Sequence, residues 1–336
     1  MRGTGALRHA ALMGLMFLVL AVPARAETDR VSLGLPAEAM QFIGYYVAED
    51  LGFFAQQDLE VKKVFLAGVA SFNAVVSGSV EFALASGASL TRAAAHGQTM
   101  LAIAQLNNRP PWDIVVRKEI AEAAHFDSGA PLATRAHILE GKTITVQGIN
   151  ALDHAYLKIV ARIGGVDPDA MTVSALAPPD TLAAFARKAI DGFASGPPWA
   201  QQVEDEGTAV AIAVGPNGEP NSIMPLGSSL VVTRPQLCTE RRAICVKMGH
   251  AMVLAAAAIH DRPQDVVAIL KKRFSAVKDT VVARSFDALV KGIPRMPAVD
   301  PKALRNADEV NVNAGFLKPE DLLKSYENLS TDEFLR

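Results

Sequence analysis

Short apolar runs rich in Val, Ile, Leu and Phe alternate along this chain with longer amphipathic segments. The runs predict β-strands and the segments between them predict helices. In the first third of the chain, strands are expected at Arg30–Leu35, Leu59–Phe65, Glu81–Ala85 and Met100–Gln105, and helices at Gln41–Gln57, Ala70–Ser77 and Leu90–His96. This alternation predicts a parallel sheet with helices on both faces.

A polar segment with two prolines, Asn107–Pro111, interrupts the alternation, which then begins again. The second series predicts strands at Trp112–Arg117, Lys142–Gln147, Met171–Leu176, Ala189–Ala194 and Ala209–Val214, and helices at Asn150–Gly164, Pro179–Lys188 and Trp199–Glu206. After the turn-rich segment Gly215–Asn221 come one more strand, Ser229–Thr233, and apolar helical stripes at Val246–Ile259, Val266–Phe274 and Ala283–Val290.

This order of elements predicts two α/β lobes that the chain crosses twice. Residues 27–108 and 231–336 would form the first lobe, with the C-terminal helices packed on it, and residues 109–230 would form the second. Such a pair of lobes can hinge about its two crossings and close on a ligand. The alternative is two sequential domains followed by a helical tail.

The first 26 residues carry the three parts of a secretory signal peptide. Arg2 and Arg8 give a positive start, residues 10–22 form an uncharged apolar run, and Ala24-Arg25-Ala26 fits an A-x-A cleavage site. The apolar run is shorter than the about 20 residues that cross a bilayer as a helix, and we expect no comparable run later in the chain. The sequence therefore predicts export to the periplasm with cleavage after Ala26. An uncleaved membrane anchor is the other interpretation.

Charge and cysteine content narrow the function further. The formal net charge of −2 becomes −5 when the three arginines of the signal segment are removed, and this balance does not suggest a nucleic-acid partner, which would require a basic face. Cys238 and Cys245 are the two cysteines. In an oxidising compartment they can form a disulfide, but a pair of reduced thiols on a helix is an equal alternative.

Residues 41–54 (QFIGYYVAEDLGFF) and 59–61 (LEV) resemble the opening of the binding proteins for nitrate, sulfonates, taurine and thiamine precursors. Residues 141–148 (GKTITVQG) and 165–168 (GVDP) are similar to later segments of the same family. The resemblance extends from about Val31 to Phe316. It implies a type II periplasmic binding fold, with two α/β lobes joined by two crossover segments. It also implies a monomer without a cofactor that delivers a small-molecule ligand to the permease of an ABC importer in the inner membrane.

Ligands of open parallel sheets lie beyond the carboxyl ends of the strands, where loops and helix N-termini meet. Residues in such positions are the candidate ligand contacts: Gln41, Phe42, Tyr45, Ser71, Ser89, Asn107, Gly148, Asn150 and Trp199. Structural roles compete with each assignment. The two serines can be N-caps, the amides of Gln41 and Asn107 can cap loops, and the rings of Phe42 and Tyr45 can belong to the core. The place of Trp199 is implied by the family resemblance.

The expected ligand is a small organic solute of the sulfonate, carboxylate or pyrimidine/aromatic type. Arg109 is the one cationic residue in the candidate loops, so helix N-termini would have to hold a charged group. Two rival functions remain at this point. One is a pyrimidine-synthase-like enzyme of the same fold, whose iron-binding Cys-rich run has no counterpart among two cysteines, and the other is a periplasmic solute sensor. We expect no enzyme, because no hydrolase or nucleotide-binding motif occurs.

Overall fold

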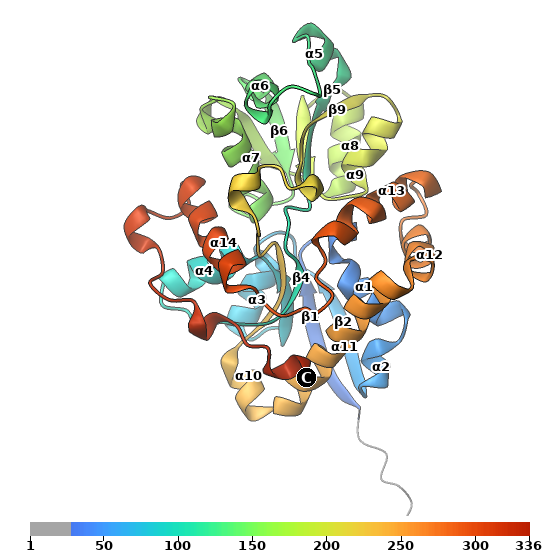
Figure 1. Ribbon diagram of the computed structural model, residues 1–336, viewed down its shortest axis with the longest axis vertical. Helices are drawn as coiled ribbons and strands as arrows, with labels where there is room; N and C mark the ends of the chain where they lie inside the picture. The colour runs from blue at the N-terminus through green and yellow to red at the C-terminus, as the bar shows by residue number, and fades with distance from the viewer. Residues whose placement is uncertain (1–27) are drawn as a thin grey trace, which may run out of the picture.

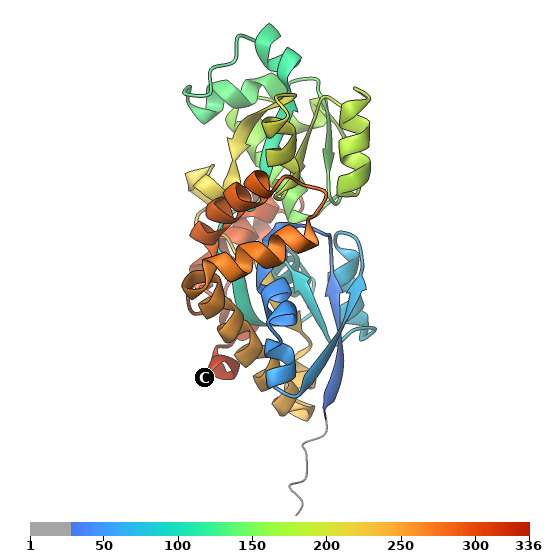
Figure 2. The ribbon, with the colours of Figure 1, turned by 90° about the vertical axis from the view of Figure 1, so that its right-hand side faces the viewer.

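The computed structural model describes residues 28–336, and the signal peptide predicted for residues 1–26 lies outside them. The chain forms two α/β lobes stacked along the long axis, each built on its own five-stranded sheet (Figure 1). Helices cover both faces of each sheet, as Figure 2 shows from the side. The predicted fold class, two α/β lobes of the periplasmic binding type, is confirmed.

Lobe 1, the lower lobe in Figure 1, contains the first and last parts of the chain. Its sheet has the order β2-β1-β3-β10-β4. The strands are β1 (Asp29–Leu35), β2 (Leu59–Phe65), β3 (Phe82–Ala85), β4 (Leu101–Asn107) and β10 (Ser229–Thr233). β1 pairs in parallel with β2 and β3, whereas β10 lies antiparallel between β3 and β4. Because β10 follows the whole of lobe 2 in sequence, the chain must return to the first sheet.

Lobe 2 repeats this plan with the order β7-β6-β8-β5-β9. Its strands are β5 (Asp113–Arg117), β6 (Thr143–Val146), β7 (Thr172–Ala175), β8 (Gly192–Ser195) and β9 (Ala209–Val214). Here β5, the first strand after the crossing, is the antiparallel one. The two crossings, β4 to β5 and β9 to β10, lie side by side, since Leu226 N donates a hydrogen bond of 2.7 Å to Asn108 O.

Fourteen α-helices are assigned in the described residues. Lobe 1 carries α1 (Ile43–Asp50), α2 (Phe53–Gln56), α3 (Ala70–Ser77) and α4 (Gly87–Ala95), and lobe 2 carries α5 (Lys118–Ala123), α6 (Leu132–Ala136), α7 (Leu152–Ile163), α8 (Pro178–Ala186) and α9 (Trp199–Asp205). The single helix predicted over Gln41–Gln57 was wrong. The chain breaks at Gly52, whose φ of 72° is left-handed and cannot continue a helix.

The C-terminal helices are α10 (Pro235–Glu240), α11 (Arg242–Asp261), α12 (Pro263–Arg273), α13 (Asp279–Leu289) and α14 (Pro301–Asn313). α11 and α12 pack on lobe 1. α13 contacts α9 of lobe 2, and α14 contacts both α4 and α7 (Figure 1). The C-terminal segment therefore links the lobes in addition to completing lobe 1.

Among the described residues, α11 is long and apolar enough to cross a bilayer by length and composition. The helix contains Lys247, so it does not contradict the expectation that no comparable uncharged run follows the first one. Met248, Ala251 and Met252 of this helix are fully buried in the core of lobe 1. The apolar composition of α11 accordingly reflects a core helix.

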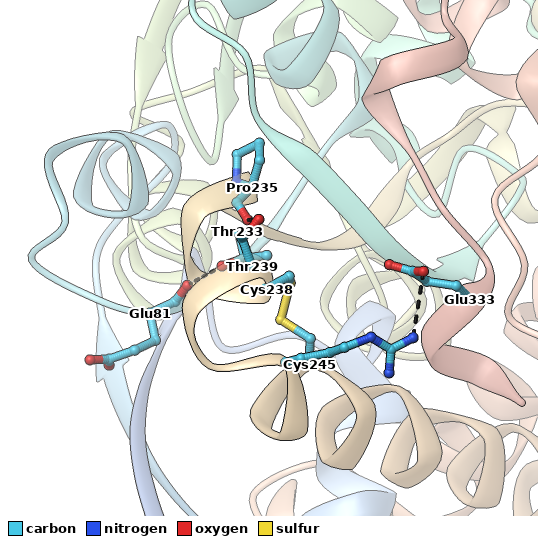
Figure 3. Close-up of a disulfide and its surroundings, with 8 residues drawn as sticks. Glu81, Thr233, Pro235, Cys238, Thr239, Cys245 and Glu333 are labelled. Atoms are coloured by element: carbon cyan, nitrogen blue, oxygen red, sulfur yellow. Dashed lines mark hydrogen bonds and ion pairs between the residues drawn. A yellow bond between two sulfur atoms is a disulfide. The ribbon is translucent and has the colours of Figure 1, made fainter.

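A disulfide joins Cys238 of α10 to Cys245 of α11, with the two Cα atoms 5.5 Å apart (Figure 3). Of the two states left open by the sequence, the structure has the bonded one. The bond lies at the end of lobe 1 that is remote from lobe 2 (Figure 1), where Thr233 Oγ1 also donates to Glu81 O at 2.7 Å. It therefore anchors the start of α11 next to the returning strand β10.

Candidate ligand-binding cleft

A small cavity, here called the inner chamber, lies between the lobes. Its walls come from the loops after β1, β2 and β3 in lobe 1, from the loop after β6 in lobe 2, and from both crossings. The lining residues are Pro36, Ala37, Gln41, Phe42, Gly68, Val69, Ser71, Phe72, Leu84, Ala85, Ser86, Ser89, Trp112, Gln147, Gly148, Ala151, Leu152, Asp153 and Ser228. These loops leave the carboxyl ends of parallel strands, which is where open α/β sheets bind ligands.

Three helices begin at the inner chamber, namely α3, α4 and α7. Ser86 is the N-cap of α4, and its Oγ accepts a hydrogen bond of 3.1 Å from Ser89 N. Ser71 lies inside α3, where its Oγ donates to Leu84 O at 3.2 Å. Helix N-termini present free N–H groups and the positive end of the helix dipole, so the chamber can hold polar groups without a cationic side chain.

Gln41 offers an acceptor that the protein itself does not use. Its side chain is 5% exposed, and Oε1 is buried without a hydrogen-bond partner among the described residues. Gly196 of lobe 2 faces this oxygen, and a side chain at Gly196 would collide with it. A buried acceptor without a partner is costly, and Gln41 also lines the inner chamber, so its amide is a candidate to pair with an N–H or O–H group when a ligand is bound.

Asp153 is the ionisable residue of the inner chamber. Burial raises the pKa of its carboxyl to about 6, although hydrogen bonds from the backbone N–H groups of Gln147 (2.5 Å) and Gly148 (3.4 Å) oppose the rise. Among the described lining residues there is no Lys, Arg or His. The inner chamber therefore disfavours an anionic group close to Asp153.

The inner chamber has an aromatic side as well. Phe42, Phe72 and Trp112 line it, and the Trp112 ring packs against Tyr156 with centroids 6.1 Å apart. Trp112 Nε1 is buried without a partner in the described part of the chain. The space that the centre of a water molecule can occupy is about 60 Å³. A compact group of similar size would fill it.

A second cavity, here called the outer chamber, opens next to the first and shares Val69, Phe72 and Ser89 with it. Measured in the same way, its volume is about 510 Å³. The other lining residues are Asn73, Arg92, Ala93, His96, Gln98, Asn150, Gly315 and Phe316. The cleft thus has a narrow inner end and a wide outer end.

The lobes touch across the cleft at several points. Met40 N donates to Pro197 O at 2.7 Å, and Trp199 Nε1 donates to Glu38 O at 3.1 Å. The loops that contain Gly68 and Gly148 are also in close backbone contact. These contacts between different lobes describe a closed arrangement around the inner chamber.

The structure brings most of the predicted site residues together. Gln41, Phe42, Ser71, Ser89 and Gly148 line the inner chamber, and Asn150 lines the outer chamber. The serines do not act as the N-caps considered from the sequence, because Val69 and Ser86 hold those positions. Sequence reasoning missed Trp112, Asp153 and Ser228.

Three predicted ligand contacts lie away from both chambers. Tyr45 is fully buried in the core of lobe 1, with its hydroxyl donating to Glu49 at 2.7 Å. The side-chain oxygen of Asn107 accepts from Arg109 N at 2.9 Å at the start of the crossing. Trp199 bridges the lobes outside the inner chamber. Each of these three side chains makes a structural contact, and none of them lines either chamber.

Comparison with known proteins gives the family. The sequence profile described as "NMT1/THI5 like" matches residues 39–266, more than half of the chain. The chain belongs to the NMT1/THI5-like family. No curated protein sequence matches it significantly.

Solved structures share the fold of this family member at low sequence identity. A protein of Bordetella bronchiseptica RB50 has a TM-score of 0.80 at 15% identity, covering 91% of this chain and 96% of its own. The alkanesulfonate-binding protein SsuA of Xanthomonas axonopodis pv. citri, bound to MOPS, has a TM-score of 0.70 at 18% identity, and the match covers 91% of this chain and 100% of SsuA. The periplasmic nitrate-binding protein NrtA of Synechocystis PCC 6803 has a TM-score of 0.71 at 16% identity, and the match covers 92% of this chain and 87% of NrtA. At these identities the likeness establishes the fold.

Proposed function

We propose that this protein is the periplasmic solute-binding component of an ABC importer. It would be exported with cleavage after Ala26, act as a monomer, capture a small organic solute between its lobes and present it to an inner-membrane permease. The observation that carries the proposal is the inner chamber, which both lobes enclose at the carboxyl ends of their strands. The sulfonate- and nitrate-binding structures of the same fold support it.

The chemistry of the inner chamber suits capture of a solute. Its polar groups are fixed hydroxyls, amides and helix N-termini, and its aromatic side gives contact area at little cost in conformational entropy. Gln41 would accept a hydrogen bond from the ligand, and Ser89 and the backbone at Gly148 would contact its other faces. Closure of two lobes around a ligand buries most of its surface.

The direct test is a solute screen with the mature protein. Sulfonates, carboxylates, nitrate, pyrimidines, sugars and metal ions would be compared by thermal shift and calorimetry, and native mass spectrometry would identify any co-purified solute. At a concentration about 100 times Kd, a true ligand stabilises the fold by about 2.7 kcal/mol. A response to sugars or metal ions alone would contradict the proposal.

A variant of Gln41 tests the place of the site. Gln41→Leu keeps the volume of the side chain and removes the buried acceptor, so affinity for a ligand found in the screen is expected to fall by about 1 to 3 kcal/mol. The melting temperature without ligand should not fall, because Oε1 has no partner within residues 28–336. Gln56→Leu, on the exposed side of α2, is the matched control. Equal affinities in both variants would place the site elsewhere.

A further inference from the structure

The two chambers of the cleft share Val69, Phe72 and Ser89 in their walls but differ in charge. Asp153 is the ionisable residue of the inner chamber, whereas Arg92 and His96 line the outer chamber and no carboxylate lines it within residues 28–336. A ligand long enough to occupy both would meet an acid at one end and a cation at the other. This arrangement would fix the orientation of such a ligand in the cleft.

Arg92 is held in place over the outer chamber. It extends from α4 of lobe 1, and its Nη2 donates a hydrogen bond of 3.0 Å to the backbone oxygen of Asn150 in lobe 2. The guanidinium carbon lies 5.6 Å from the centroid of the Phe316 ring. One N–H group and one ring face therefore orient the side chain, and the remaining N–H groups of the guanidinium are left for other acceptors.

No carboxylate of residues 28–336 neutralises Arg92. No ion pair of Arg92 occurs in the described part of the chain, and burial is the cause that lowers its pKa. A partly buried guanidinium without an acid loses hydration and gains no compensating charge. An anion in the outer chamber would supply that compensation.

The charged groups around Arg92 are mainly cationic. Lys158 of α7 lies over the same Phe316 ring at 5.8 Å, and its partner Asp169 is 86% exposed at the surface. The pKa of His154 is lowered to about 4, first by burial and then by Lys158, and its neutral Nδ1 accepts from Asn150 N at 3.1 Å. Lys158 is thus paired with an acid, whereas Arg92 has no acidic partner within residues 28–336, so Arg92 is the group that favours a negatively charged ligand here.

We infer that the ligand of this cleft is bipartite. A compact nitrogen-bearing head without negative charge occupies the inner chamber, and a carboxylate, sulfonate or phosphate group binds Arg92 in the outer chamber. The inference rests on the proposed function and narrows it to one substrate class. The head would pack against Gln41 and the aromatic side of the inner chamber, and the anion would form paired hydrogen bonds with the guanidinium, the geometry in which Arg exceeds Lys.

Arg92 thereby becomes the residue that determines specificity for the anionic end. It also touches Asn150 across the cleft, so a role as a simple latch between the lobes must be separated from recognition. A latch would strengthen the binding of every ligand by the same factor. An anion-binding residue would strengthen the binding of anionic ligands alone.

Matched ligand pairs make that separation. The probes are aminopyrimidines and aminobenzenes that carry a carboxylate, sulfonate or phosphate ester, together with 3-aminopropanesulfonate. Each is compared by calorimetry with its neutral carboxamide, sulfonamide or alcohol. The proteins are the mature wild type, Arg92→Gln, Arg92→Lys and the control Arg187→Gln, which removes an exposed arginine at the end of α8.

In the wild type, the anionic member of the best-binding pair should bind at least tenfold more tightly than its neutral partner. Arg92→Gln should weaken the anionic member at least tenfold and change the neutral member less than twofold. Arg92→Lys should retain part of the preference, and Arg187→Gln all of it. Raising the salt concentration should weaken the anionic member selectively.

Three results would overturn the inference. One is equal affinity for the two members of every pair. Another is an equal loss of affinity for both members of a pair in Arg92→Gln, which would mean that Arg92 only latches the lobes together. The third is failure of the wild type to bind any probe. The proposed function would survive all three if the wider solute screen or the co-purified solute revealed a different ligand, and it would fall if they revealed none.

Discussion

The carboxyl group of Asp153 shows how a single residue sets the character of the site. Its side chain is 3% exposed, and it accepts hydrogen bonds from the two backbone N–H groups at Gln147 and Gly148. Burial nevertheless prevails and raises the pKa to about 6. Near neutral pH the protein therefore keeps a poorly solvated charge in the wall of the inner chamber.

This shift predicts how stability depends on pH. The folded chain binds a proton at Asp153 more tightly than the unfolded chain does, whose pKa is near 3.8. The contribution of Asp153 to the free energy of unfolding thus falls as pH rises from about 4 to about 6 and is constant above. As pH rises from 4 to 7, the free energy of unfolding of Asp153→Asn should increase relative to that of the wild type by at most about 3 kcal/mol. Urea unfolding at several pH values measures this difference.

Asp29 provides a control with the opposite sign. A hydrogen bond from Lys247 lowers the pKa of Asp29, so this residue stabilises the fold above its ordinary pKa and loses that contribution as pH falls. Asp29→Asn should therefore lose stability at pH 7 and approach the wild type in acid. If Asp153→Asn followed the same course as Asp29→Asn, the account of Asp153 would be wrong.

At the residue scale, the sequence predicted the loops of the site better than the side chains. Gln41, Ser71 and Gly148 follow directly from their positions after predicted strands. Trp112 and Ser228 were missed because they lie in the crossings, and their approach to the chamber depends on how the lobes close. Trp199 could not be placed from local pattern, since its partner Glu38 is 161 residues away in sequence.

At the scale of the elements, the disulfide holds α10 next to α11, and packing against the core holds α11 on lobe 1. Cys245 is fully buried at the start of α11, whose apolar face enters the core of lobe 1. The bond closes a short loop, with a sequence separation of 7 between the cysteines. In the chain-entropy view a loop of this length stabilises a fold by about 2.5 kcal/mol.

Loss of the disulfide should therefore affect stability and spare binding. The double variant Cys238→Ala/Cys245→Ala should lower the free energy of unfolding by about 2 to 3 kcal/mol and leave ligand affinity unchanged, because the bond lies at the end of lobe 1 remote from lobe 2 (Figure 1). Denaturant unfolding with and without a reductant measures the effect. Reductant should destabilise the wild type and have no effect on the double variant.

The prediction of helices and strands was accurate where the apolar residues form one clear run or repeat. The strands from Arg30 to Val214 were located by their apolar runs, and their order led to the correct fold. No apolar stripe was predicted for α14, because its buried positions include small or polar residues, such as Ala303, Ala307 and Asp308, which acquire partners from α4 and α7. The break at Gly52 was missed because the apolar pattern continues across it.

For the whole molecule, the closed arrangement depends on a few contacts between the lobes. Trp199 of α9 packs on Phe274 of lobe 1, with ring centroids 5.9 Å apart, and donates to Glu38 O. It lines neither chamber. Trp199 can therefore change the balance between open and closed forms without touching the ligand.

Trp199→Phe tests whether ligand affinity depends on this balance. The variant keeps an aromatic ring against Phe274 and loses the N–H donor, which weakens the closed form by about 1 kcal/mol. Because a ligand binds the closed form more tightly, every ligand should lose about fivefold in affinity, whatever its chemistry.

Gln41→Leu and Arg92→Gln should instead discriminate between ligands by their donors or charge. Small-angle scattering should still show compaction of Trp199→Phe at saturating ligand, since the ligand can shift the remaining population. A loss confined to one ligand class would mean that Trp199 contacts the solute, and the separation of closure from recognition would fail.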